Sequence, residues 1–262
     1  MNRPRGRGVT PLVTILATLL AVALLGAEPV GAAPSAPPAP QGARATATHV
    51  AAARAAALRP KIVWRPIAFG AKRKREMAGY SKRHYGHRIW RLSHPRAIVE
   101  HYTDGGTFAG AWATMASNAR NLGELPGVCA HFVVDTDGTI YQVVPLRIRC
   151  RHTIGLNQTA IGIEHVGTSD HGVMSNHRQR RASIRLTLWL VARFGIQVRN
   201  VIGHGESLMS PLRHELYPTW KCNTHTDFSP AAMHRYRKLL RVRAIARHVP
   251  IGPKPRWVDI GC

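Results

Sequence analysis

Two histidines and an acid in this sequence have the side-chain types and the placement of a metal site. His101 ends the apolar run at Ile98-Val99, and His204 ends a second apolar run at Val201-Ile202. The ends of strands at the rim of a sheet are where sites are commonly assembled. A third candidate ligand, Asp227, lies in the segment 223–228. Two imidazoles and one carboxylate form the ligand set of a catalytic zinc site, which leaves a fourth position open for water or substrate.

A second acid, Glu164, lies inside the apolar segment 160–167. A carboxylate placed in an apolar strand is costly unless it is paired, bound to something or tuned for proton transfer. We therefore expect Glu164 to be a functional residue, and proton transfer is the chemistry that its surroundings favour.

The periodicity of the chain predicts strands that alternate with helices. The segments 131–134 and 139–144 are rich in β-branched residues and flank Asp137-Gly138, a strong hairpin signal. We expect further strands at 95–102, 160–167 and 196–202, helices at 107–121, 183–194 and 229–242, and a polar loop at 171–181. This order predicts an α/β fold, a sheet with helices packed on it.

The N-terminus has the layout of a secretory signal peptide, which we assign to residues 1–32. A basic start, Met1 to Gly8, precedes an apolar run from Val9 to Gly26 and a small-x-small exit at Val30-Gly31-Ala32. The alternative is an uncleaved membrane anchor. Export is the prediction that Pro11 and the small-residue exit favour.

Residues 33–60 are dominated by Ala and Pro, and we expect a disordered spacer there. Residues 61–95 form a basic flank whose aromatic residues suggest packing on a domain, and residues 243–262 form a basic tail. The formal charge is +24 over 262 residues. In an exported protein this charge predicts contact with anionic wall polymers or a membrane surface, and not with nucleic acid.

Four cysteines, Cys129, Cys150, Cys222 and Cys262, would lie in an oxidising compartment after export. Four cysteines allow three pairings. Proximity along the chain favours Cys129–Cys150 and Cys222–Cys262.

Six short motifs occur in one order along the chain. They are IVEHY at 98–102, AHFVVDTDGTI at 130–140, RH at 151–152, IGIE at 161–164, VIGH at 201–204 and TDF at 226–228. In this order they resemble the zinc-dependent N-acetylmuramoyl-L-alanine amidases, which share a fold with the peptidoglycan recognition proteins. The resemblance covers about residues 96–240, and we expect residues 96–242 to form the zinc amidase domain.

The resemblance implies a mixed sheet flanked by helices. It also implies hydrolysis of the amide between N-acetylmuramic acid and L-Ala of the peptidoglycan stem. Carried over by motif, Zn²⁺ would be held by His101, His204 and Asp227, and Glu164 would be the catalytic base. The expected setting is a monomeric bacterial protein that is secreted and associated with the cell wall.

The segment between His204 and Asp227 departs from the family pattern in two ways. The family usually has Lys two residues before the carboxylate ligand, and this sequence has His225, which we assign to stabilising the oxyanion. The segment is also longer than usual and contains His214. The third metal ligand is therefore Asp227, His225 or His214, with Asp227 preferred.

Other residues near these motifs have candidate supporting roles. The resemblance places His152 beside the substrate, and the alternative for this residue is a structural hydrogen bond. We expect Asn157 and Thr159 to contact the peptide stem. His131 is expected to serve the core or to support a ligand, and Glu206 to orient a ligand or to remain a surface acid.

Two other functions are compatible with parts of this pattern. A non-catalytic peptidoglycan recognition protein would have the groove without turnover, but such members typically lose a zinc ligand. A cationic protein that perturbs walls or membranes would keep its activity in Glu164→Ala and lose it steeply with salt.

Overall fold

The computed structural model describes residues 41–262, so the predicted signal peptide and the first part of the predicted spacer lie outside the described residues. Its centre is a six-stranded sheet with the order β1-β4-β3-β5-β2-β6. The strands are β1 (Val63–Trp64), β2 (Ala97–Tyr102), β3 (Phe132–Val134), β4 (Ile140–Gln142), β5 (Ala160–His165) and β6 (Val201–Gly203). Only the β3–β4 pairing is antiparallel among these neighbours, which confirms the predicted mixed sheet.

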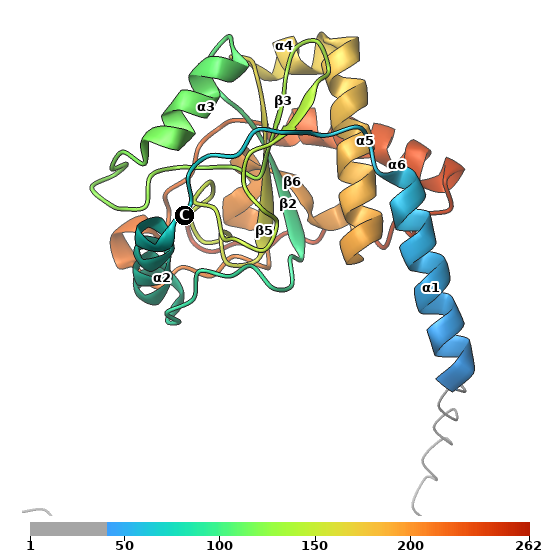
Figure 1. Cartoon of the computed structure of the whole chain (residues 1–262), viewed down its shortest axis with the longest axis horizontal. Coiled ribbons are helices and arrows are strands. Elements are labelled where there is room, and N and C mark those ends of the chain that lie inside the picture. Colours follow the sequence, from blue (N-terminus) through green and yellow to red (C-terminus); the bar gives the residue numbers. More distant parts are fainter. Residues whose placement is uncertain (1–40) are drawn as a thin grey trace, which may run out of the picture. The chain divides into compact units, whose positions relative to one another are not determined.

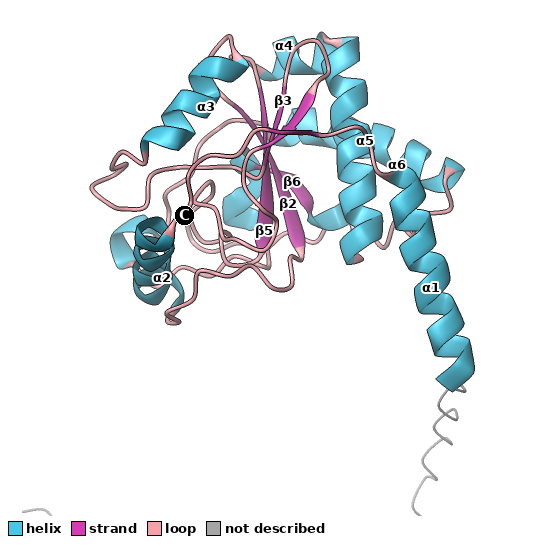
Figure 2. Ribbon diagram, in the orientation of Figure 1, coloured by secondary structure: helices cyan, strands magenta, loops and turns pink. Residues whose placement is uncertain are grey.

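Helices cover both faces of the sheet (Figure 2). The helices are α1 (Gln41–Leu58), α2 (Ala71–Tyr85), α3 (Phe108–Ser117), α4 (Asp170–Ser175), α5 (His177–Phe194) and α6 (Pro230–Ala246). Helices α4, α5 and α6 share one core cluster with Ile98, Phe132 and Ile163 of the sheet. Helices α2 and α3 share a second cluster with Val133 on the opposite face. Period-two alternation along the strands sends neighbouring side chains to opposite faces, so each face has its own core.

Three neighbouring parallel strands, β5, β2 and β6, end at the same edge of the sheet. Figure 1 shows the long strands β2 and β5 side by side in the middle of the molecule. Because parallel strands present their carboxyl ends together, residues at the ends of these three strands converge.

The second part of the expected disordered spacer at 33–60 is helical, because α1 begins at Gln41 and ends at Leu58. The prolines of this stretch stop at Pro40 and resume at Pro60, and the intervening residues are rich in Ala, the best helix former. Near its end, α1 contacts the domain: Ala55 is buried, and Leu58 packs against the core shared by α5 and α6.

The predicted loop at 171–181 is wrong, because α4 and α5 occupy it. Each helix has a side-chain cap: Ser169 accepts a hydrogen bond from the backbone N–H of Gly172, and Asn176 accepts two at the start of α5. Ser and Asn are strong N-cap residues, so polar composition here marks helix starts. The predicted strand at 196–202 is also shorter, since a 3-10 helix, Val198–Asn200, precedes β6.

Both expected disulfides are confirmed: Cys129 is bonded to Cys150, and Cys222 to Cys262. The first lies within the core cluster beneath α2 and α3. The second ties the basic tail back to the segment that leads to Asp227. Among the described residues, no helix combines the length and apolar character needed to cross a membrane.

Candidate active site

His101, His204 and Asp227 come together at the edge where the parallel strands end. His101 is the fifth residue of β2, and His204 follows the last residue of β6. Asp227 comes from the segment before α6. Its Oδ2 lies 3.0 Å from His101 Nδ1, and its Oδ1 lies 3.2 Å from His204 Nδ1. One candidate ligand atom from each of the three residues lies within 4.8 Å of the other two.

This set fits a zinc ion in both chemistry and spacing. Ligand atoms on a tetrahedral zinc at about 2.0–2.1 Å lie roughly 3.3 Å apart, close to the two contacts of Asp227. Burial raises the pKa of Asp227, but the hydrogen bonds from His101 and His204 outweigh it and hold that pKa well below its usual range. Burial lowers the pKa of His101. A charged carboxylate and a neutral imidazole are the protonation states that bind metal.

Glu164 lies beside this set because its strand is paired in register with β2. Glu164 is opposite His101 in the β2–β5 pairing, so both side chains leave the same face of the sheet. Its Oε2 is buried and has no hydrogen-bond partner among the described residues. Burial, with a smaller contribution from the charge of Asp227, raises the pKa of Glu164 to about 8. A buried carboxylate without a partner has the character of a general base.

The four residues line a pocket of about 290 Å³. His225 also lines it, and its ring stacks on that of His204 with a centroid distance of 5.1 Å. His225 is exposed. His214 is exposed as well and does not line the pocket. The pocket walls further include Tyr102, Thr103, Asp104, Met115, Asn121, Leu122, Val128, Cys129, Arg151, His152, Thr153 and Ile154.

His152 lies directly behind His101. Its Nδ1 is 3.1 Å from His101 Nε2 and 2.8 Å from the hydroxyl of Thr153. Burial and the neighbouring His101 lower its pKa well below the ordinary value, so the ring is neutral. His152 both lines the pocket and orients His101, which combines the two roles that the sequence left open.

Asn157 and Thr159 do not reach the pocket, so the expected contacts with a peptide stem are wrong. Both are buried. Asn157 Oδ1 accepts hydrogen bonds from the backbone N–H groups of His152 and Thr153, and Thr159 Oγ1 accepts one from Arg96. Asn157 therefore shapes the loop that presents His152, because its side-chain oxygen accepts hydrogen bonds from two backbone N–H groups of that loop.

The two other candidate supporting residues are buried. His131 accepts a hydrogen bond from the N–H of Gly162 through Nδ1 and donates one to the carbonyl of Ile148 through Nε2. This confirms its expected place in the core. Glu206 pairs with Arg237 through two contacts of 2.6 and 2.8 Å and also accepts the N–H of Gly203. It fixes the backbone turn before His204 and does not touch the imidazole.

Thr153 and Arg151 support the pocket, although neither has a predicted role. Thr153 Oγ1 is 3.2 Å from His101 Nε2, and no sequence signal marks it. Arg151 was part of a motif, and the structure shows its guanidinium bonded to the backbone carbonyls of Asn121, Glu124 and Pro126. It therefore stabilises one wall of the pocket.

Residues 91–216 match the family model described as N-acetylmuramoyl-L-alanine amidase. Similar solved structures include two from Clostridium intestinale URNW. The endolysin N-acetylmuramoyl-L-alanine amidase LysCS is 22% identical over 55% of this chain and 80% of its own, with a TM-score of 0.37. The N-acetylmuramoyl-L-alanine amidase LysC is 18% identical over 70% of this chain and 99% of its own, with a TM-score of 0.45.

A mutant endolysin from Bacillus subtilis is 22% identical over 74% of this chain and 100% of its own, with a TM-score of 0.39. None of the curated proteins compared with the chain matches it. The family match contains His101, Glu164 and His204 and ends before His225 and Asp227. The likeness of this chain to the N-acetylmuramoyl-L-alanine amidase family thus lies in residues 91–216.

Proposed function

We propose that the protein is a secreted, zinc-dependent hydrolase of peptidoglycan. Its reaction would cleave the amide between the lactyl group of N-acetylmuramic acid and L-Ala of the stem peptide. The observation that carries the proposal is the placement of Glu164, whose Oε2 is buried and has no partner among the described residues, in one pocket with His101, His204 and Asp227. The family match supports the substrate class.

His101, His204 and Asp227 would hold the zinc ion. Bound zinc supplies a Lewis acid that polarises the amide carbonyl and acidifies water. Glu164 accepts a proton from the water that attacks the amide carbon. It then gives this proton to the amine nitrogen as the C–N bond breaks, so that the products are a carboxylate and a free L-Ala amino group.

Two further histidines support this chemistry. An N–H of His225, which faces the pocket beside His204, would donate to the oxygen that gains charge as the carbonyl carbon becomes tetrahedral. His152 would hold the ring of His101 in place through the 3.1 Å contact.

The location of the reaction follows from the substrate and from the cysteines. Peptidoglycan lies outside the cytoplasmic membrane, and the two disulfides suit an oxidising compartment. The basic charge would favour contact with anionic wall polymers or membrane surfaces. Secretion is tested by comparing the N-terminus of the mature protein with the expected cleavage after residue 32.

The activity is tested on purified peptidoglycan with wild type, Glu164→Gln and a zinc-stripped sample. New L-Ala amino termini, identified by mass spectrometry, are expected from wild type. We expect a loss of about 10²- to 10⁴-fold in Glu164→Gln, because the proton acceptor is gone. The exposed Asp259→Asn serves as the matched control and should keep full activity. If wild type binds peptidoglycan and releases no amino termini, the protein is a recognition module and not an amidase.

A further inference from the structure

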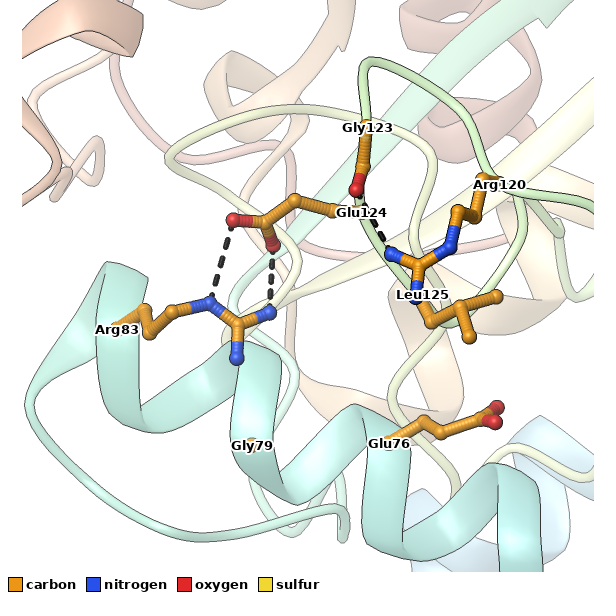
Figure 3. Close-up of a pocket in the computed structure, with 7 residues that line it drawn as sticks. All are labelled: Glu76, Gly79, Arg83, Arg120, Gly123, Glu124 and Leu125. Carbon is orange, nitrogen blue, oxygen red and sulfur yellow. Dashed lines mark hydrogen bonds and ion pairs between the residues drawn. The ribbon is translucent and has the colours of Figure 1, made fainter.

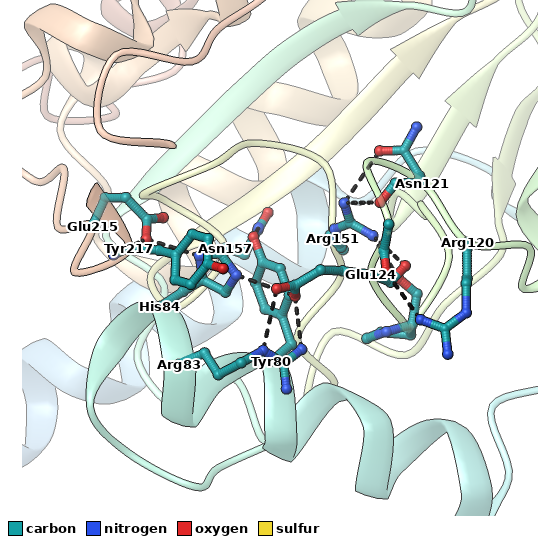
Figure 4. Close-up of polar contacts among 12 residues, drawn as sticks. Tyr80, Arg83, His84, Arg120, Asn121, Glu124, Arg151, Asn157, Glu215 and Tyr217 are labelled. Carbon is teal, nitrogen blue, oxygen red and sulfur yellow. Dashed lines mark hydrogen bonds and ion pairs between the residues drawn. The ribbon is translucent and has the colours of Figure 1, made fainter. Parts of the chain in front are cut away.

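His84 of α2 lies buried between two carboxylates that come from distant parts of the chain. Its Nδ1 is 2.8 Å from Glu215 Oε1, and its Nε2 is 3.2 Å from Glu124 Oε2. The side chain of His84 has no exposed surface, and that of Glu215 is 1% exposed. Figure 4 shows the imidazole between the two acids. Glu124 and Glu215 lie within the residues that match the amidase family, and His84 lies before them.

Each ring nitrogen of His84 faces a carboxylate oxygen. Arg83 donates through Nε and Nη2 to the same carboxylate of Glu124. Burial acts to raise the pKa of Glu124, but the hydrogen bonds from Arg83 and His84 lower it below its usual value. His84 therefore links Glu124 and Glu215 through opposite sides of one ring.

Glu124 belongs to one wall of the active-site pocket. Its backbone exchanges two hydrogen bonds with Asn121, at 3.1 and 3.2 Å, and Asn121 and Leu122 line the pocket. Arg151 bonds to the carbonyls of both Asn121 and Glu124. The position of Glu124 thus sets the position of this wall.

Glu215 belongs to a segment that does not line the pocket but contacts the loops that do. The N–H of the preceding His214 donates to the carbonyl of Gly155, next to the pocket residue Ile154. Arg213 donates to the carbonyls of Lys221 and Asn223 in the segment leading to His225 and Asp227. Besides His84, the carboxylate of Glu215 accepts one hydrogen bond, from the N–H of Tyr217. His84 is therefore its one side-chain partner among the described residues.

Aromatic rings enclose His84 and exclude water from it. Tyr80 stacks on it with a centroid distance of 4.0 Å, and Trp220, Tyr217 and Tyr85 surround it. Burial raises the pKa of Tyr80 to about 12 and that of Tyr85 well above its ordinary value, so both stay neutral near physiological pH. Arg151 lies over Tyr80 and Trp220 and stays charged.

A second hollow lies on the outer side of the same contact (Figure 3). Arg83 and Glu124, which line it, are paired with each other. Arg120 donates to the carbonyl of Gly123 there, and Glu76 accepts a hydrogen bond from Asn118. Its charged groups are thus engaged by the protein itself. The hollow marks the outer side of the contact and is not a separate site.

We propose that His84 is a positioning residue whose ring, bonded to Glu124 and Glu215, holds the segments 118–128 and 210–223 together beside the substrate pocket. Loss of the ring removes both contacts and lets the segment of Glu215 move away from that of Glu124. The pocket should then bind substrate less well while the metal ligands and Glu164 stay in place. The consequence for substrate rests on the proposed amidase function, but the movement of the two segments does not.

The movement is tested by hydrogen–deuterium exchange of zinc-loaded wild type and His84→Gln at one pH. In His84→Gln, residues 118–128 and 210–223 should exchange at least about fivefold faster than in wild type, because the clamp opens. The exposed His87→Gln is the matched control and should follow wild type.

Glu215→Gln provides a second variant with an intact His84. A neutral amide is a weaker hydrogen-bond acceptor than a carboxylate, so the segment 210–223 should exchange faster than in wild type while residues 118–128 keep their contact with Arg83 and His84. For hydrolysis, we expect the KM of His84→Gln to lie roughly tenfold above that of wild type, with a smaller change in kcat.

Wild-type protection of both segments in His84→Gln, or of residues 210–223 in Glu215→Gln, overturns the proposal. A kcat loss in His84→Gln with unchanged KM also overturns it, since the effect would then lie in the chemistry. If wild type releases no L-Ala amino termini, the proposed function fails, and the exchange experiment still decides whether His84 holds the two segments together.

Discussion

Glu164 and His101 are register partners on the adjacent parallel strands β5 and β2. Because paired residues point to the same face, the acid and the imidazole enter one pocket from rigid strands. Val133 of β3 is the next partner along this row, so the base is flanked by an apolar side chain and a candidate metal ligand. These neighbours shield Glu164 from water, and this desolvation is the main cause of its raised pKa.

The identity of the third ligand can be decided by zinc binding. Adding zinc at about 100 times its Kd to chelator-treated wild type should stabilise the fold by about 2.7 kcal/mol, or roughly 5–10 °C in Tm. His204→Ala and Asp227→Ala should lose this shift, because each supplies a ligand atom. His214→Ala should retain it, as an exposed residue away from the pocket. A shift lost in His214→Ala and kept in Asp227→Ala would make His214 the ligand.

His225 should contribute to the rate without contributing to zinc affinity. We expect His225→Ala to lower kcat by about 10²-fold, the effect of removing one donor to an oxyanion, with the zinc-dependent shift in Tm unchanged. His225→Lys should restore the activity, since it returns a cation to that position. Loss of the zinc-dependent Tm shift in His225→Ala would instead identify His225 as a ligand.

Gly162 should be indispensable because His152 packs against its Cα. A Cβ at this position would lie 2.6 Å from His152 Cγ, so the ring would have to move away from His101. We expect Gly162→Ala to destabilise the fold by about 1–3 kcal/mol and to lower kcat by roughly tenfold or more. Gly106→Ala, with no atom within 4 Å of the added carbon, is the control.

A double variant tests whether the Gly162 effect acts through His152. Adding His152→Ala to Gly162→Ala should cost little further activity, because the two changes disturb one contact. Fully additive losses in kcat would contradict this explanation.

The raised pKa of Glu164 predicts a pH dependence of stability in the metal-free protein. Its pKa is about 8 when folded and 4.5 ordinarily, so the folded state binds more protons between these values. Stability therefore falls as pH rises through this window. Glu164→Gln removes the effect and should stabilise the protein more at about pH 8 than at about pH 5, by on the order of a few kcal/mol.

Thermal unfolding of chelator-treated samples at the two pH values measures this difference. Asp259→Asn, which changes an exposed acid in the tail, should follow wild type at both. Asp227 acts in the opposite direction, because its pKa is lowered, and its contribution is lost at acid pH. A Glu164→Gln stabilisation that is equal at both pH values would show that burial does not hold the carboxyl protonated.

The candidate residues of the site could be picked out from local sequence. His101, His204 and Glu164 each end or interrupt an apolar strand, and a strand long enough to be buried can be recognised from a few residues. The disulfide pairing followed from proximity along the chain, and the mixed sheet was implied by the resemblance to the amidase family. The starts of α4 and α5 could not be predicted in this way. The Ser and Asn residues found there occur in loops as well as at helix caps, and what packs next to them decides between the two.

What only the tertiary structure decided depends on contacts between distant residues. Asn157 looked like a residue that faces the substrate, and the fold instead turns its amide onto the backbone of His152. His84 carries no sequence signal, because its two carboxylates lie 40 and 131 residues away. Sequence by itself determined which side chains could do chemistry. The fold determined which of them meet, because a buried polar group takes its role from the partner that satisfies it.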